Sequence, residues 1–338
     1  MAKNKVKTGL ADVAQRAGTG IATVDRVLNQ RGGVSPQTEQ RVLDAAREIG
    51  LRRILPIPYM RTLRIEVFLG PGFTPFMRRL SHAMAQIAAT LDRSITLLRC
   101  NTDINDTTHV AARIKNSLAD GIVIYCSEAD ENIEAITAAE AAGRPVICIV
   151  TDVPDSPRTA YVGIDHAKAG RTAGFLVART SPHHGKALIL TTSIGFRAHK
   201  QRIDGFKAAL AAHAPDMRVL PELTTQDMDE SSYHHVMRSL RHEASDITAI
   251  YNTGGGNAGV GRALKDQARK EALIFVGHEL TEESTLLLND GIMTVAIDQA
   301  PEIQARRSID LMLKKLNGKP LDTAEGEIAF TLHTLENS

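Results

Sequence analysis

A glycine-rich turn late in the chain has the spacing of a nucleotide-binding motif. Gly254, Gly256 and Gly259 fit the pattern G-x-G-x-x-G between an apolar run and a helix-like stretch, and Glu279 follows twenty residues after the last glycine. In dinucleotide-binding enzymes such glycines let the backbone approach a pyrophosphate at a helix N-terminus, while the acid binds the ribose. The first hypothesis is therefore an NAD-dependent dehydrogenase.

Other reactive side chains form no pattern that predicts catalysis. Cys100, Cys126 and Cys148 lie in or at the edge of apolar strand-like runs and lack metal-ligand spacing, which favours buried thiols in a reducing compartment. Adjacent histidines such as His183 and His184 point to opposite sides of a helix or strand, so a shared metal ion is not expected. The sequence has no Ser-His-Asp or Cys-His motif. We therefore expect no enzyme, no metal site and no cofactor.

Charge is distributed unevenly along the chain. The 338 residues are 43% hydrophobic and 23% charged, with a net charge of +1. Residues 1–64 contain twelve Lys or Arg and five Asp or Glu, whereas the rest of the chain contains 28 basic and 34 acidic residues. A basic head on a mildly acidic body suggests contact with nucleic acid, although a solvated basic face would have the same composition. Because the sequence shows neither a signal peptide nor a membrane-length apolar run, we expect a cytoplasmic protein with no membrane partner.

The basic head has the pattern of three short helices. Leu10–Ala17 places apolar residues on one face, Gly18–Gly20 breaks the pattern, and Ile21–Asn29 resumes it. A Ser-Pro cap at 35–36 starts the third helix, which ends at Gly50. Two helices joined by a short glycine-containing turn predict a helix-turn-helix DNA-binding unit.

Beyond the head, short apolar runs alternate with amphipathic stretches. Pro56 and Pro58 forbid a regular helix in residues 51–61, which we interpret as a linker. Alternating strands and helices predict parallel sheets covered on both faces. Residues 62–338 have too many strands for one open sheet, so we expect an α/β body of two doubly wound parallel-sheet lobes, behind a small all-α head in residues 1–50. The strand-like runs are RIEVFL, ITLLR, GIVIYC, PVICIV, AYVGI, KALIL, DITAIY, ALIFVG and MTVAI.

The head resembles that of a known family of bacterial repressors. LADVAQRAGTGIATVDRVLN followed by GGVSPQTEQRVLDAAREIG matches, without a gap, the motif D-V-A-x-x-A-G…T-V-x-R-V-L-N of the LacI/GalR family. Members join such a head to a two-lobed, periplasmic-binding-protein-like sensor, which residues 63–338 resemble. The resemblance implies a repressor that acts as a homodimer on a palindromic double-stranded operator. Its operator affinity would be controlled by a small sugar, polyol or derivative bound between the lobes.

Side chains at the start of the second helix are the candidates for reading DNA. Ile21 and Ala22 are expected to contact a thymine methyl group in the major groove, while Arg26 reaches guanine or a phosphate. The polar candidates for phosphate contacts are Thr19, Thr23 and Asn29. Helix capping alone would also explain polar residues at the ends of a helix.

Three features depart from the family's pattern. Gly20 stands where a Ser or Thr cap is usual, and Asp25 stands where Ser is usual. A carboxylate beside DNA is repulsive unless it pairs with Arg26 or accepts from a cytosine amino group. The linker is a few residues shorter than usual and contains two prolines, so we expect no regular hinge helix across residues 54–59 and a weak bend in the operator.

In the sensor fold the effector lies in the crevice between the lobes, at the C-terminal ends of strands. Phe73 and Phe76 follow the first strand, where the family's aromatic residues stack on a sugar ring, although core packing would explain them equally well. Asp152 follows PVICIV, where a carboxylate could bind two sugar hydroxyls or cap the Pro154 turn.

The second lobe contributes a basic residue and several polar ones. Arg197 and Lys200, with His199 between them, compete for a basic position in a loop–helix segment. Convergent acids, amides and a base suit a polyhydroxy ligand, because directional hydrogen bonds reject analogues that leave them unpaired. Because three basic side chains lie in this segment, an acidic or phosphorylated sugar is also a possible ligand. The candidates at later strand ends are Asn252, Asn257, Glu279, Asp298 and Gln299. Either Asp298 or Gln299 could instead belong to the hinge between the lobes.

The resemblance also gives the glycine turn a different interpretation. The turn follows a late strand, whereas a dehydrogenase would carry it in its first strand–helix–strand unit. In the sensor fold this loop offers a polar side chain, Asn252 or Asn257, to the ligand, and the glycines allow close backbone approach. We therefore reject the dehydrogenase hypothesis. The basic head and the missing signal peptide argue against the remaining rival, a periplasmic-type sugar-binding protein.

Overall fold

The computed structural model describes residues 9–29, 31–51, 62–70, 74–181, 184–192, 195–242, 246–267 and 273–338. The chain forms two compact units, Met1–Leu63 and Arg64–Ser338, which we call the head and the body. Phe73 and residues 52–61 of the predicted linker lie outside the described residues, as does the expectation of no hinge helix across 54–59.

The head consists of three helices around a small apolar core. They are α1 (Leu10–Ala17), α2 (Ile21–Leu28) and α3 (Pro36–Glu48), as the sequence pattern predicted. The Ser35 hydroxyl oxygen accepts a hydrogen bond from the Thr38 N–H at 3.3 Å, so the local sequence defines where α3 begins. Fully buried apolar side chains from all three helices form the core: Val13, Val24, Val42, Leu43 and Ala46.

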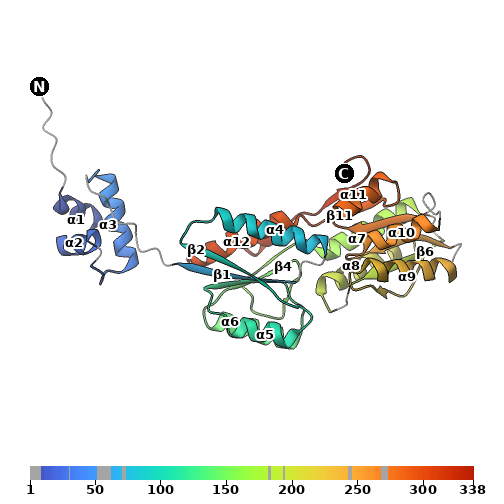
Figure 1. Ribbon diagram of the computed structural model, residues 1–338, viewed down its shortest axis with the longest axis horizontal. Coiled ribbons are helices and arrows are strands. Elements are labelled where there is room, and N and C mark those ends of the chain that lie inside the picture. The colour runs from blue at the N-terminus through green and yellow to red at the C-terminus, as the bar shows by residue number, and fades with distance from the viewer. Residues whose placement is uncertain are drawn as a thin grey trace, which may run out of the picture. The chain divides into compact units, whose positions relative to one another are not determined.

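The first lobe of the body is a parallel five-stranded sheet between two pairs of helices (Figure 1). Its strand order is β2-β1-β3-β4-β5. Helices α4 and α12 cover one face, and α5 and α6 cover the other. The strands are β1 (Leu63–Leu69), β2 (Ile95–Asn101), β3 (Gly121–Ile124), β4 (Val146–Ile149) and β5 (Ala160–Val162), and the helices are α4 (Pro75–Thr90), α5 (Thr107–Lys115), α6 (Asp130–Ala141) and α12 (Pro301–Leu316).

The second lobe is a sheet of order β12-β11-β10-β9-β6-β7, with β8 also paired to β6. Alternate residues of its strands pack against α7 and α8 on one face and against α9, α10 and α11 on the other. Only β12 runs antiparallel to its neighbour among the described strands. The strands are β6 (Lys186–Thr191), β7 (Arg218–Val219), β8 (Leu223–Thr224), β9 (Ile247–Asn252), β10 (Ile274–His278), β11 (Val295–Asp298) and β12 (Thr331–His333), and the helices are α7 (His166–Thr180), α8 (Arg197–His213), α9 (Asp229–His242), α10 (Asn257–Asp266) and α11 (Glu282–Asn289).

The predicted arrangement of two α/β lobes is confirmed. Each of the nine strand-like runs contains an observed strand, and the strands that the sequence pattern missed are the short β7, β8 and β12. Cys126 and Cys148 are buried, as expected, and burial raises the pKa of the Cys126 thiol to about 12. Cys100 is only partly buried.

The described chain passes between the lobes at three places. It crosses at residues 163–165 after β5, at 299–300 after β11, and at 327–330 after the short 3-10 helix η1 (Thr323–Gly326). The first and third crossings run side by side, because Gly163 donates to the Gly326 carbonyl oxygen at 3.2 Å and accepts from the Ile328 N–H at 2.9 Å. These paired segments form a hinge along one side of the body.

Helices α7 and α8 pack unusually closely because small residues lie where they cross. A Cβ added to Gly170 would lie 2.1 Å from the Arg202 carbonyl oxygen, and one added to Gly205 would lie 2.4 Å from the Ala167 carbonyl oxygen. Only glycine allows the two backbones to approach this closely. The contact fixes the position of Arg202 on α8.

Candidate functional site

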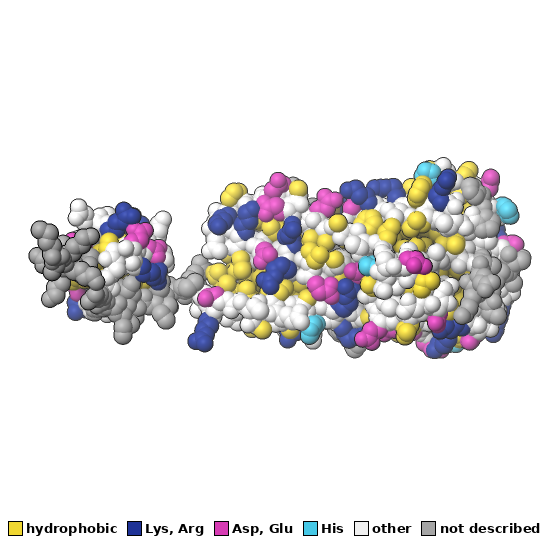
Figure 2. All heavy atoms as spheres, turned by 90° about the horizontal axis from the view of Figure 1, so that it is seen from above, with side chains coloured by type: hydrophobic (Ala, Val, Ile, Leu, Met, Phe, Trp, Pro, Cys, Tyr) yellow, Lys and Arg dark blue, Asp and Glu magenta, His cyan; other side chains and the backbone are white. Residues whose placement is uncertain are grey.

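One face of α2 in the head is exposed and carries the predicted DNA-reading residues. Ile21 is 53% exposed, and Ala22 and Arg26 are also exposed, whereas Val24 and Val27 on the opposite face are buried. An exposed isoleucine suits contact with an apolar group such as a thymine methyl. Figure 2 shows acidic and basic side chains interspersed over one face of the described body.

The polar residues at the end of α2 bond mainly to one another. Asn29 Nδ2 donates to the Asp25 carbonyl oxygen at 3.0 Å and to Asp25 Oδ1 at 2.6 Å. Asp25 Oδ2 accepts from Arg31 Nη1 at 2.8 Å. The carboxylate is therefore neutralised by Arg31 and not by Arg26, the partner that sequence reasoning considered. Gly20 begins α2 without a side-chain cap, as its type requires.

The glycine turn of the body binds carboxylates of the protein itself. Asp227 Oδ1 accepts from the Gly255 N–H at 2.5 Å, and Asp229 Oδ1 accepts from the Gly259 N–H at 3.2 Å. A Cβ on Gly259 would lie 1.8 Å from the Asp229 carbonyl oxygen. The side chains of Asp227, in the loop before α9, and of Asp229, its first residue, thus take the place at the start of α10 that a pyrophosphate would need. The glycines are explained by this internal contact.

Both asparagines of the turn brace the ends of β9 and β10. Asn252 Nδ2 donates to the Gly255 carbonyl oxygen at 2.8 Å and to Asn257 Oδ1 at 2.7 Å. Asn257 Nδ2 in turn donates to the His278 carbonyl oxygen at 2.8 Å. Asn252 is completely buried, and its Oδ1 has no hydrogen-bond partner among the described residues. Asn252 Oδ1 can therefore accept a hydrogen bond from a ligand, whereas Asn257 Oδ1 already accepts from Asn252.

Glu279 and Gln299, predicted on separate strand ends, come together. Gln299 Nε2 donates to Glu279 Oε1, and both side chains are buried. Burial, reinforced by the nearby Asp298 carboxylate, raises the pKa of Glu279 to about 8. Within the described structure Glu279 Oε2 and Gln299 Oε1 have no hydrogen-bond partner, like His278 Nδ1. With Asn252 Oδ1 they give the ends of β9, β10 and β11 four unpaired polar atoms.

Asp298, which sequence reasoning considered with Gln299 for a role in the hinge, bonds the backbone beside the second crossing. Its Oδ1 accepts from the Leu280 N–H and its Oδ2 from the Ala300 N–H, each at 3.0 Å. The same carboxylate forms an ion pair with Arg79 at 2.6 Å. These contacts leave Gln299 as the residue of this pair that faces Glu279.

Of the basic trio on α8, only Arg197 meets the first lobe. Its Nη1 lies 3.0 Å from Glu128 Oε1 in the loop after β3. His199 is buried, and burial next to the Arg202 charge lowers the pKa of its imidazole to about 4. Lys200 is exposed. Glu128 was not predicted, although its place just after a strand is the signal that identified other candidates.

An aromatic contact joins the lobes beside this ion pair. The rings of Tyr125, after β3, and Phe196, before α8, stack with centroids 5.1 Å apart. The Ala198 N–H donates to Thr151 Oγ1 at 3.2 Å. The ring contact and this hydrogen bond show that the lobes touch at this place.

Phe76 packs in the core of the first lobe and is 8% exposed, which fits the core-packing alternative better than stacking on a sugar.

Arg202 on α8 is a buried charged residue that sequence reasoning missed. Its Nε donates to His166 Nδ1 at 3.2 Å and its Nη1 to the Thr253 carbonyl oxygen at 2.6 Å. His166 Nε2 lies 2.6 Å from the Val150 carbonyl oxygen, so Nε2 carries the proton and Nδ1 accepts. Burial, together with the Arg202 charge, holds the pKa of His166 well below its usual value. The start of α7 and the middle of α8 thus bring together a fixed cation and a neutral imidazole.

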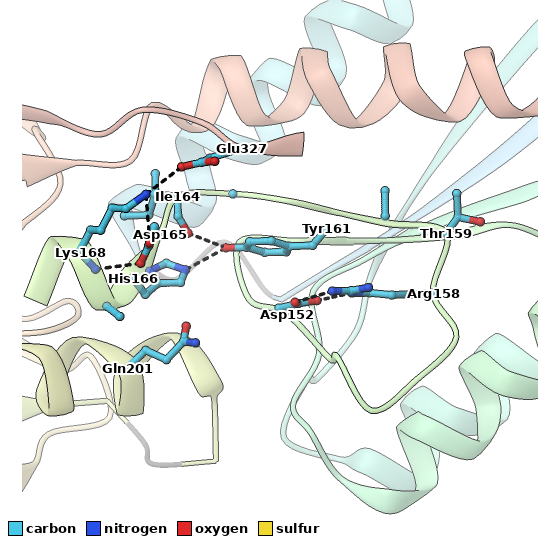
Figure 3. A pocket seen from close by; sticks show the side chains of 13 residues that line it. Asp152, Arg158, Thr159, Tyr161, Ile164, Asp165, His166, Lys168, Gln201 and Glu327 are labelled. Carbon is cyan, nitrogen blue, oxygen red and sulfur yellow. Dashed lines mark hydrogen bonds and ion pairs between the residues drawn. The ribbon is translucent and has the colours of Figure 1, made fainter. Parts of the chain in front are cut away.

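A cavity of about 600 Å³ opens beside the first and third crossings (Figure 3). Asp152 lines it, the only predicted effector residue among those that the structure describes to do so, and its carboxylate accepts from Arg158 Nε and Nη2. Lys168 Nζ lies 3.3 Å from both Asp165 Oδ2 and Glu327 Oε1. The structure therefore places Asp152 apart from Glu279 and Gln299, with its charge already neutralised.

Comparison with known proteins gives the class of each part. Residues 9–53 match the family described as bacterial regulatory proteins, lacI family, and residues 71–320 match the family described as periplasmic binding protein domain. The fold and the site thus define a two-lobed binding protein that carries a helix-turn-helix head. The chain belongs to the periplasmic binding protein domain family, with the head of the lacI family of bacterial regulatory proteins.

Individual relatives include both repressors and sugar carriers. The chain is 27% identical over 211 residues to the HTH-type transcriptional repressor PurR of Aliivibrio salmonicida, covering 60% of each chain. It is 25% identical over 199 residues to the ribose import binding protein RbsB of Escherichia coli, covering 59% of this chain and 66% of that one. Each alignment spans less than two thirds of the relative. A ribose operon repressor from Halalkalibacterium halodurans is 24% identical over 98% of this chain and 97% of its own.

Solved structures of similar fold include sugar-binding proteins. A glucose-galactose binding protein from Geobacillus stearothermophilus has a TM-score of 0.73 at 19% identity, covering 82% of this chain and 98% of its own. A transporter solute-binding protein from Burkholderia graminis, in complex with D-arabinose, has a TM-score of 0.73 at 21% identity, covering 83% of this chain and 98% of its own. Among the described residues, no helix combines the length and the apolar character needed to cross a membrane.

Proposed function

We propose that the protein is a transcriptional regulator, acting as a repressor, that binds operator DNA through its head and a small sugar, polyol or derivative through its body. The single observation that carries this proposal is the union of the two parts in one chain. A lacI-family head precedes a binding-protein body, and the ribose operon repressor aligns over both. The exposed isoleucine and arginine of α2 suit contact with DNA, which a sugar carrier does not need.

The DNA contacts proposed for the head follow from its geometry. Ile21 and Ala22 reach base edges, and Arg26 reaches guanine or a phosphate. Thr19 and Thr23 remain proposed phosphate contacts. The proposal for Asn29 requires its amide to leave Asp25, because both of its Nδ2 hydrogen bonds go to that residue.

The effector site proposed for the body centres on the ends of β9, β10 and β11. Glu279, Gln299 and Asn252 bring buried, unpaired polar atoms to this edge, which is the composition a polyhydroxy ligand needs. Arg197 is proposed to exchange its ion pair with Glu128 for the effector. The remaining proposed contacts, which have weaker geometric support, are Phe73, Phe76, Asp152, Lys200 and Asn257.

The chemistry of these contacts is recognition, and we propose that the protein is not an enzyme and uses no cofactor. Asp227 and Asp229 already bind the glycine turn, which removes the reason to assign it to a nicotinamide dinucleotide. We further propose a homodimer that acts in the cytoplasm, because two symmetric heads would read a palindrome. The proposed domains are residues 1–50 for DNA binding, 51–61 as linker and 62–338 for effector binding and dimerisation.

Selection from random double-stranded DNA tests the proposal. The full chain should enrich a palindrome whose half-sites are separated by about 10 bp or a multiple. In the Arg26→Ala variant the enrichment should weaken if Arg26 contacts guanine, while the circular dichroism spectrum stays the same. Binding of wild-type protein to all sequences alike, with no preferred palindrome, would contradict the proposal.

A further inference from the structure

One arginine of the first lobe reaches the ends of two strands of the second. Arg79, on α4, is 27% exposed and donates through Nη1 to Asp298 Oδ1 at 2.6 Å and to the Leu280 carbonyl oxygen at 3.0 Å. Its Nε and Nη2 donate to the two carboxylate oxygens of Glu302 on α12, each at 2.9 Å. A single guanidinium therefore joins two helices of one lobe to the loop after β10 in the other.

The acceptor at the centre of this contact also shapes the backbone around it. The Asp298 carboxylate accepts from the N–H groups of Leu280 and Ala300. Burial opposes ionisation of Asp298, but Arg79 and these N–H groups outweigh it and hold the pKa of the carboxyl below its usual value. Ala300 has a φ of +51° and Glu279 a φ of +72°, a region that side chains other than glycine adopt at a cost. The contact between Arg79 and Asp298 thus helps to hold the strained backbone at Glu279 and at Ala300.

The strained residues and their neighbours include the centre of the proposed effector site. Glu279 directly precedes Leu280, and Gln299 directly follows Asp298. Each of these two effector residues is therefore one peptide bond from a group that Arg79 holds. Arg79 Nη1 also lies 3.9 Å from Glu279 Oε2, which has no hydrogen-bond partner among the described residues.

We propose that Arg79 is a positioning residue of the effector site, which locks the lobes together and holds Glu279 and Gln299 against each other through Leu280 and Asp298. Opening of the lobes would withdraw α4 from the Leu280 carbonyl and release this loop. Because Arg79 already bonds Glu302 in a planar fork, it moves with the first lobe as one body. The role in effector recognition rests on the proposed function, whereas the lock between the lobes does not.

The distance between the lobes measures the lock directly. Spin labels are placed on Ala138→Cys of α6 and Ala211→Cys of α8, both exposed, in a full chain whose partly exposed thiol is removed by Cys100→Ser. The labelled chain is mixed with an excess of unlabelled chain, so that in a homodimer the label pairs within one chain dominate. Pulsed electron paramagnetic resonance then gives the distribution of distances. In the otherwise wild-type chain we expect one narrow population, and in the Arg79→Met chain a broad population at longer distance.

Two further variants separate the lock from a general loss of packing. Asp298→Asn should broaden the distribution as Arg79→Met does, and the two substitutions together should add nothing to either alone. Arg262→Met is the matched control, because its ion pair with Glu230 lies within the second lobe; it should leave the distribution unchanged. Arg79→Lys, which keeps the charge but not the fork, should give an intermediate result and serves if Arg79→Met fails to fold.

Hydrogen exchange and sugar binding complete the test. The backbone amides of Leu280 and Ala300 should exchange at least about tenfold faster in Arg79→Met, because they lose the fixed acceptor. A thermal-shift panel of D-ribose, D-allose and D-arabinose is measured in parallel: if the wild-type chain responds, Arg79→Met should need at least about tenfold more of that sugar to reach the same shift. If no sugar binds to the wild-type chain, the proposed effector fails and the lock is judged on distance and exchange alone. Wild-type distances and exchange rates in Arg79→Met would overturn the lock.

Discussion

Substitution of Glu279 by glutamine would expose how much the buried carboxyl at the crevice contributes to the stability of the body. The side chain is 7% exposed, and its pKa of about 8 lies well above the ordinary 4.5. Between these two values the carboxyl is neutral when folded and ionised when unfolded. Rising pH therefore favours the unfolded chain throughout this window, and the stabilising effect of the neutral form is complete only below the unfolded pKa.

The magnitude follows from the size of the pKa shift. One pKa unit corresponds to about 1.4 kcal/mol, so the free energy of unfolding should fall by about that amount per pH unit, and by roughly 5 kcal/mol over the whole window. Glutamine does not titrate and can still accept from Gln299. The difference in stability between wild type and Glu279→Gln should therefore decline steadily from about pH 5 to pH 8.

Urea unfolding of the full chain at several pH values measures this difference. The buried histidines, whose stabilising effect is lost as the pH falls below about 6.5, act equally in both proteins and cancel in the comparison. Glu282→Gln is the matched control, because this neighbouring carboxylate is exposed and its loss should leave the pH dependence as in wild type. A wild-type minus Glu279→Gln difference that stays constant with pH would refute the reasoning.

Three other substitutions test separate parts of the structure. Gly170→Ala should cost roughly 1–3 kcal/mol of stability by calorimetry, because its Cβ would meet the Arg202 carbonyl oxygen at 2.1 Å; an unchanged melting temperature would contradict this. Asp227→Ala should lower stability by roughly 1–3 kcal/mol in urea by removing the acceptor of the glycine turn, and a stable variant that acquires nicotinamide binding would contradict our interpretation of the turn. Arg26→Ala should weaken specific operator binding by roughly 1–3 kcal/mol in fluorescence anisotropy, whereas Arg47→Ala on α3 should not. An equal loss of affinity for all sequences would make Arg26 a phosphate contact.

Elements with strong local signals could be predicted from the sequence. The Ser35 cap fixes the start of α3, and each of the nine strand-like runs contains a strand of a covered sheet. The missed strands β7, β8 and β12 are only two or three residues long, too short to show any periodicity. They form because a neighbouring strand offers unpaired backbone groups, which no local pattern records.

The same distinction applies to the candidate site. Glu279 and Gln299 could be predicted near each other, because parallel strands bring their C-terminal ends to one edge. Side-chain partners far apart in the chain could not: Arg197 finds Glu128 69 residues away, and Arg79 finds Asp298 219 residues away. Residue type alone therefore identified polar candidates. It did not show which of the charged candidates form ion pairs within the protein.

Operator affinity in the presence of sugar is the most direct test of the central claim, that one chain couples a DNA-reading head to a sugar-binding body. Fluorescence anisotropy with the operator obtained by selection gives the dissociation constant of the full chain alone and with each of D-ribose, D-allose and D-arabinose. We predict that at least one such sugar or a related polyol changes this constant about tenfold or more in wild type, and leaves it unchanged in Glu279→Ala. A wild-type chain that binds a sugar and a selected operator independently, with neither affinity affecting the other, would contradict the account.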